Sequence, residues 1–175
     1  NKAFSRIDRV ESSHWNLYYS RGVALERIKL WKRAEEDFLK ALELEPDQPF
    51  VLNYLGYSWV EQGRNLIQAR EMIEKAVSQR SDDGYMVDSL GWVLYRLGEW
   101  KKAVYHLERA VELRPQDAVI NDHLGDALWR VNRRNEAKFQ WRRALTLKPD
   151  VELVNGIKTK LKDGLAKPEK IKLSR

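Results

Sequence analysis

The residues of this chain best suited to chemistry are two carboxylates and a histidine in one short stretch, Asp122, His123 and Asp126. On a helix Asp122 and Asp126 would share a face, and His123 with Asp126 could in principle bind a metal ion. The other histidines, His14 and His106, are scattered, and no nucleophile is paired with a base as covalent catalysis requires. We therefore expect His123 to pack near a boundary between structural units. We predict no enzyme, no metal site and no cofactor.

Composition excludes several further classes of protein. The chain has no cysteine, so disulfides, thiol catalysis and thiolate metal sites are ruled out. No apolar run approaches the roughly 18 residues that a membrane-spanning helix needs. The glycines follow a regular spacing and do not form a phosphate-binding loop, so we expect no nucleotide or other small-molecule substrate. The absence of an initiator methionine suggests a piece of a longer protein.

Positive charge is concentrated at the carboxyl-terminal end. The net charge of the chain is +6, and residues 127–175 carry 14 Lys or Arg against five Asp or Glu. One interpretation is an anionic partner, such as nucleic acid or a membrane surface. The other, which we favour, is a solvated last helix followed by a disordered tail, because a high pI alone does not indicate nucleic-acid binding.

Small residues recur with a fixed period. A glycine inside a helix costs about 1 kcal/mol relative to alanine, so recurrent glycines need a structural reason. Two series of small residues keep the same phase, and the glycines are separated by 34, 35 and 34 residues: Gly22, Gly56, Gly91 and Gly125, then Ala41, Ala76, Ala110 and Ala144. A period near 34 indicates two antiparallel helices per unit. We expect these small residues to let the paired helices approach closely.

The phase divides the chain into units. We expect an all-α solenoid of stacked antiparallel helix pairs, with about four repeats and flanking helices. Glycines such as Gly63 and Gly98, and Asn132 in the last unit, should end first helices in a left-handed conformation. The predicted segments are a remnant second helix at 1–14, repeats at 15–48, 49–83, 84–117 and 118–151, a capping helix at 152–166, and a disordered tail at 167–175.

This pattern resembles the tetratricopeptide repeat (TPR) family, and the resemblance covers residues 15–151. It implies a superhelix whose first helices line a groove. By analogy with the family, certain first-helix positions face that groove, and they include an aromatic strip beside acidic and amide side chains. The residues so assigned are Tyr19, Asn53, Tyr57, Asp88, Trp92, Tyr95, Asp122, Asp126, Trp129 and Arg130. Aromatic side chains would supply most of the affinity, and the aspartates would favour a basic or amine-bearing segment. The alternative is that the tryptophans only fill gaps between repeats.

A more specific resemblance rests on the wording "LNYLGYSWVEQG" and "INDHLGDALWRVNRRNEAKFQWRRAL". These stretches are similar to the carboxyl-terminal repeats of long TPR proteins of Gram-negative bacteria, some of them outer-membrane lipoproteins of the periplasm. One such relative is an adaptor for a carboxyl-terminal processing protease. The resemblance implies a periplasmic scaffold with a protein or peptide partner, such as a protease or its substrate, although a cytoplasmic location stays open. The alternative function is self-assembly through the truncated amino-terminal end around Phe4.

Overall fold

The computed structural model describes residues 11–167, and every regular element in that range is helical. The described chain forms two compact units, the first reaching Arg80 and the second starting at Ser81. Residues 1–10 of the expected remnant helix (1–14) and residues 168–175 of the expected tail (167–175) lie outside the described residues.

The first unit contains two antiparallel helix pairs, which follow the short 3-10 helix η2 (Ser12–His14). Its helices are α1 (Trp15–Arg27), α2 (Trp31–Leu44), α3 (Pro49–Glu61) and α4 (Leu66–Gln79). The paired helices α1 and α2 are joined through Lys29, which has a left-handed backbone with φ 59°. The turn between α3 and α4 is one residue longer, and Asn65 absorbs that residue at φ 50°.

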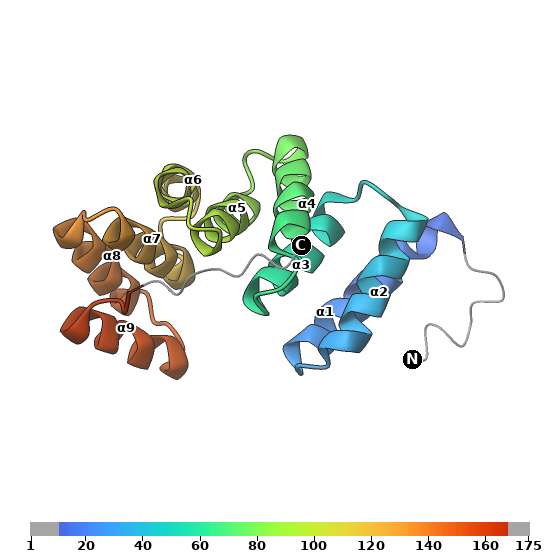
Figure 1. The fold of residues 1–175 in the computed structure, drawn as a ribbon. Coiled ribbons are helices and arrows are strands. Elements are labelled where there is room, and N and C mark those ends of the chain that lie inside the picture. The colour runs from blue at the N-terminus through green and yellow to red at the C-terminus, as the bar shows by residue number, and fades with distance from the viewer. Residues whose placement is uncertain (1–10, 168–175) are drawn as a thin grey trace. The chain divides into compact units, whose positions relative to one another are not determined.

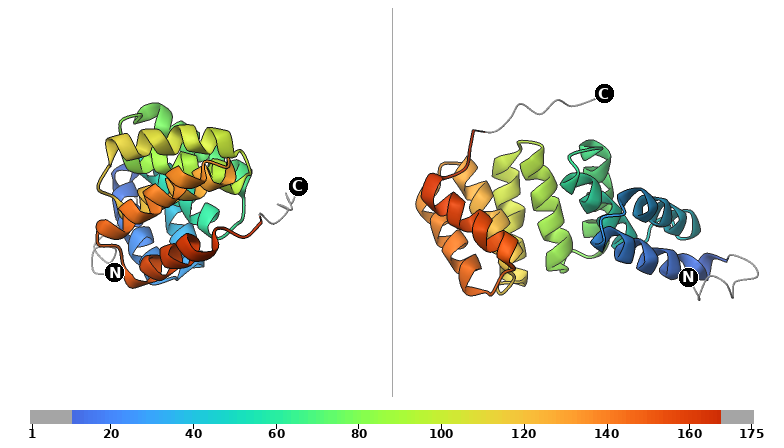
Figure 2. Two further views of the ribbon diagram at one scale, coloured as in Figure 1. Left: turned by 90° about the vertical axis from the view of Figure 1, so that its left-hand side faces the viewer. Right: turned by 90° about the horizontal axis from the view of Figure 1, so that it is seen from below.

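The second unit contains two further pairs and a last helix (Figures 1 and 2). Its helices are α5 (Gly84–Arg96), α6 (Trp100–Leu113), α7 (Ala118–Arg130), α8 (Arg134–Thr146) and α9 (Val151–Asp163). The aspartate before each first helix caps it: Asp83 accepts a hydrogen bond from the backbone N–H of Tyr85 at 3.0 Å, and Asp117 from that of Val119 at 2.9 Å. Such caps satisfy donors that the helix itself leaves unpaired.

The recurrent small residues lie where the helices of each pair cross. A Cβ atom added to Gly91 would stand 2.5 Å from Cγ of Leu107, and one added to Gly125 would stand 2.4 Å from the Trp141 ring. Gly22 and Gly56 face Phe38 and Ile73 in the same way, and the alanines of the second series have no exposed surface. The large core residue of each second helix therefore occupies space that a side chain on the first helix would need.

The turns inside the pairs have the expected backbone. Gly63 and Gly98 have φ of 68° and 80°, and Asn132 takes the same left-handed conformation at φ 66°. These residues direct each second helix back along the first, which brings the first helices α5 and α7 side by side in the second unit. The side chains that project from α5 and α7 form the site described next.

Candidate functional site

A buried ion pair joins the first helices of the second unit. Nδ1 of His123 on α7 lies 3.0 Å and 3.1 Å from the two carboxylate oxygens of Asp88 on α5. Both residues are buried. Burial lowers the pKa of His123, but the charge of Asp88 and its hydrogen bond outweigh that effect and raise the pKa above its ordinary value. The expectation that His123 would pack near a unit boundary fits this position.

Two aromatic rings extend from that ion pair. The ring of Trp92 is stacked on His123 with a centroid separation of 4.0 Å and an interplanar angle of 10°. Tyr95 is stacked on Trp92 at 4.7 Å and 4°. Trp92 and Tyr95 stay partly exposed, while His123 beneath them is buried. Trp92 is therefore held between the rings of His123 and Tyr95, and the charged pair fixes the orientation of this stack.

The carboxylates of α7 bind a lysine of the chain itself. Nζ of Lys160 on α9 lies 2.6 Å from Asp122 and 2.8 Å from Asp126. Asp126 also accepts a hydrogen bond from Nε1 of Trp141 at 2.9 Å. Burial and the neighbouring Asp122 raise the pKa of Asp126 to about 6, against the opposing effect of Lys160. Burial lowers the pKa of Lys160, but Asp126 and Asp122 together raise it above its ordinary value.

At the end of α7, Trp129 and Arg130 contact the segment that follows α9. A Cβ atom added to Gly164 would stand 2.1 Å from the Trp129 ring, so the backbone of Gly164 lies against that ring. Arg130 donates hydrogen bonds to the hydroxyl of Tyr95 at 3.2 Å and to the carbonyl of Ala166 at 2.5 Å. Trp129 also packs on Trp141, with the ring centroids 5.2 Å apart.

These positions differ from the sequence prediction in two respects. Asp88, Asp122 and Asp126 were expected to line an open groove, but each is at most 6% exposed. Trp129 was expected on the same open strip and is partly covered by Gly164. The physical reason is that the chain supplies its own counter-charges, and α9 with the following segment lies over α7. Trp92, Tyr95 and Trp129 all stay partly exposed.

The first unit carries three predicted site residues, Tyr19, Asn53 and Tyr57. The rings of Tyr19 and Tyr54 meet edge to face at 5.5 Å. Asn53 on α3 is 9% exposed, and its side-chain oxygen has no hydrogen-bond partner among the described residues. Tyr57 lies one turn further along α3 and is partly exposed. This unit therefore offers an amide and a tyrosine where the second unit has charged pairs.

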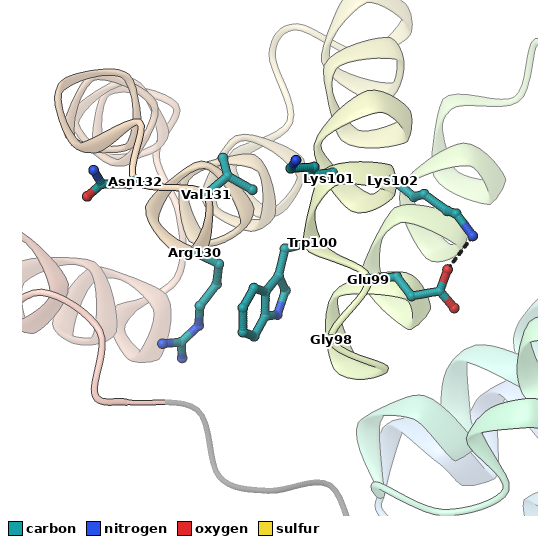
Figure 3. A pocket seen from close by; sticks show the side chains of 8 residues that line it. All are labelled: Gly98, Glu99, Trp100, Lys101, Lys102, Arg130, Val131 and Asn132. Carbon is teal, nitrogen blue, oxygen red and sulfur yellow. Dashed lines mark hydrogen bonds and ion pairs between the residues drawn. The ribbon is translucent and has the colours of Figure 1, made fainter.

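Sequence reasoning did not predict a hollow of about 530 Å³ beside the turn that joins α5 to α6. Trp100 and Arg130 face each other across it, and Lys102 is paired with Glu99 at 2.6 Å (Figure 3). Its lining residues are Gly98, Glu99, Trp100, Lys101, Lys102, Arg130, Val131 and Asn132. The sequence signal was present, because a glutamate, an aromatic residue and two lysines follow the turn glycine in "GEWKK".

Sequence reasoning also left Lys160 outside the site. Lys160 follows Asp126 by 34 residues, but α9 begins only 33 residues after α7, so the repeat period does not predict this contact. Within residues 11–167 no three His, Asp or Glu side chains are placed to hold a metal ion. No helix in the same range has the length and apolar character to cross a membrane.

Comparison with known proteins identifies the repeats. A tetratricopeptide repeat model matches residues 16–48, and a TPR repeat model matches residues 91–132. The TPR repeat-containing protein PA4667 of Pseudomonas aeruginosa is 35% identical over 92 residues, which is 53% of this chain. The chain covers 16% of the length of that relative.

Solved structures share the fold. The structure of TTC0263, a thermophilic TPR protein of Thermus thermophilus, has a TM-score of 0.76 at 20% identity, covering 86% of this chain and 83% of that one. YrrB, a TPR protein with an unusual peptide-binding site, has a TM-score of 0.61 at 26% identity, covering 84% and 77%. MamA from Desulfovibrio magneticus RS-1 has a TM-score of 0.66 at 22% identity, covering 76% and 75%. The chain is therefore an all-α array of tetratricopeptide repeats.

Proposed function

We propose that this chain is a non-catalytic scaffold that binds a protein or an extended peptide on the first helices of its repeats. The observation that carries the proposal is the stack of Trp92 and Tyr95 over the buried Asp88–His123 pair. Trp and Tyr dominate the energetics of protein interfaces. Rings that are already held in place lose little conformational entropy when a partner covers them.

The chemistry around the stack supports a polypeptide ligand. Arg130 donates to a backbone carbonyl of Ala166, which is the contact that an extended peptide would offer. In the first unit, the unpaired oxygen of Asn53 can accept a hydrogen bond from a backbone N–H. YrrB, one of the structural neighbours, has a described peptide-binding site. No group of side chains in the described range suggests catalysis instead.

The test is a comparison of captured proteins between two variants. Trp92→Ala removes half of the aromatic stack, whereas Tyr105→Ala removes a ring that is 71% exposed on α6, away from α5 and α7. Wild type and both variants, each shown by circular dichroism to be folded, would be used to capture partners from a cell-envelope extract. The captured protein would then be purified and titrated calorimetrically against each variant.

We expect Trp92→Ala to lose the partner and Tyr105→Ala to keep it. Equal binding by the two variants would show that the aromatic stack is not the working surface. Tyr57→Ala makes the same comparison for the first unit.

We further propose that the partner belongs to the bacterial cell envelope, where a protease or one of its substrates is the expected class. The sequence resemblance to periplasmic repeat proteins supports this setting, and the relative from Pseudomonas aeruginosa supports a bacterial source. Fractionation of cells that express the tagged full-length protein tests it: recovery with the envelope supports the proposal, and recovery only with the cytosol contradicts it.

A further inference from the structure

The last helix, α9, does not continue the repeat. In the earlier turns one residue separates the proline from the helix cap, as between Pro115 and Asp117. Before α9, Pro149 is followed directly by the cap, Asp150. Lys148 has a left-handed backbone at φ 56°, a conformation that side chains other than glycine rarely adopt. The shorter turn means that α9 starts one residue early relative to the repeat phase.

The helix α9 packs on α8 and buries fewer residues than the first helices α5 and α7. Of the residues of α9, Ile157 alone is fully buried, whereas α5 and α7 are buried along most of their length. The ammonium group of Lys160 forms the ion pairs between α9 and α7, with the carboxylates of Asp122 and Asp126. A competing charge can displace a contact that one charged group makes.

The residues after α9 continue along the same surface. Gly164 has φ 74° and lies against the Trp129 ring, and the Ala166 carbonyl accepts a hydrogen bond from Arg130. Residues 160–166 therefore contact four residues that the sequence analysis assigned to ligand binding. The ammonium group meets Asp122 and Asp126, the glycine backbone meets Trp129, and the carbonyl meets Arg130.

One acceptor on this surface stays unused. Asp122 is 4% exposed, and its Oδ1 atom has no hydrogen-bond partner among the described residues, because Lys160 reaches only Oδ2. An ammonium group is a compact point charge, whereas a guanidinium group presents five donors in a planar fork. An arginine in place of Lys160 could donate to both oxygens of Asp122 and still reach Asp126.

We propose that residues 160–166 occupy a binding site on α7 of their own chain. The partner that binds this site is a segment of another protein with an arginine four residues before a glycine. The inference rests on the proposed function and specifies its ligand. A second copy of this chain is a poorer occupant, because it would bring the same lysine and leave Oδ1 of Asp122 unpaired.

The test uses three synthetic peptides as probes against the full chain. The first copies residues 157–167, and the other two carry K160R or K160A at the corresponding position. The chain variant Gly164→Ala should loosen the cis segment, because a Cβ atom there would collide with Trp129 and the backbone has positive φ. Gly156→Ala on α9 is the matched control, since a Cβ atom there meets nothing within 4 Å.

We expect the K160R peptide to bind most tightly and the K160A peptide not to bind, as measured by fluorescence anisotropy. Affinity for the Gly164→Ala chain should exceed that for wild type by about tenfold, because the variant frees a site that the cis segment fills most of the time. The Gly156→Ala chain should bind the peptides no more tightly than wild type, because that substitution does not loosen the cis segment.

Equal affinity of the three peptides would overturn the inference, as would no binding to a Gly164→Ala chain that circular dichroism shows to be folded. A doubled mass of Gly164→Ala by light scattering, suppressed by the peptides, would assign the site to a second copy and equally contradict it. In each case a partner that still depends on Trp92 would leave the proposed function intact.

Discussion

The two units build the same helix pairs but differ in the chemistry of one repeat position. Asn53 of the first unit and Asp88 of the second both lie three residues before the packing glycine of their first helix. Asn53 has an oxygen without a partner in the described part of the chain, whereas Asp88 is paired with a buried histidine. The comparison teaches that the fold requires little of this position, so its side chain can serve stability in one unit and recognition in the other.

The largest expected effect comes from removing the charged side chain at this position. Asp88→Ala leaves His123 buried without its counter-charge, and breaking such a pair costs about 3–5 kcal/mol of unfolding free energy. Asn53→Ala should change stability by no more than about 1 kcal/mol, since its side-chain oxygen has no bond to lose. Urea denaturation of both variants measures the contrast. Equal losses would mean that the two units use this position alike.

Replacing the packing glycines should instead lower the stability of the two units by similar amounts. Gly91→Leu and Gly56→Leu each force a side chain into space filled by the facing helix, where the nearest atoms belong to Leu107 and Ile73. Overpacking of this kind costs about 1–3 kcal/mol or more. The melting temperature of each variant, monitored by circular dichroism, measures this loss of stability. A variant with the melting temperature of wild type would show that the paired helices can move apart without a loss of stability.

The repeat phase predicted the framework because it is encoded locally. A glycine facing Leu107, and left-handed turns at Gly98 and Asn132, need only the helix pair to which they belong. The charged contacts could not be predicted in the same way. His123 could have paired with Asp126 on its own helix, and the choice of Asp88 depends on how α5 packs on α7. Lys160 depends on a turn one residue shorter than its counterparts, which shifts α9 relative to the repeat phase.

A smaller effect should appear in the pH dependence of the second unit. The pKa of Asp126 is raised from 3.8 to about 6, so its protonated form stabilises the folded state, and that contribution is lost as pH rises through 6. The pKa of His123 is also raised, so the stability from its charged form is present below 6.5 and is lost as pH rises through its folded value. Both groups therefore make the folded chain less stable as the pH rises.

We therefore expect the urea midpoint to fall between pH 5 and pH 8, and amide exchange in α7 to accelerate over that range. His123→Gln should flatten the upper part of the curve. His106→Gln is the control, because His106 lies on α6 with its ring against that of Tyr105, whereas the buried pair belongs to α5 and α7. An upward slope in wild type would mean that the acids of α7 are ionised more easily in the folded chain than in the unfolded one.

The smallest effect distinguishes the repeats from the helix that follows them. Gly156 lies inside α9 with open space around it, unlike the glycines that face a second helix. Gly156→Ala should therefore stabilise the chain by about 0.5–1 kcal/mol, the difference in helix propensity. Native-state amide exchange should show the gain in α9 rather than in α7. A loss of stability would mean that α9 packs against a surface near Gly156, as α5 and α7 do at their packing glycines.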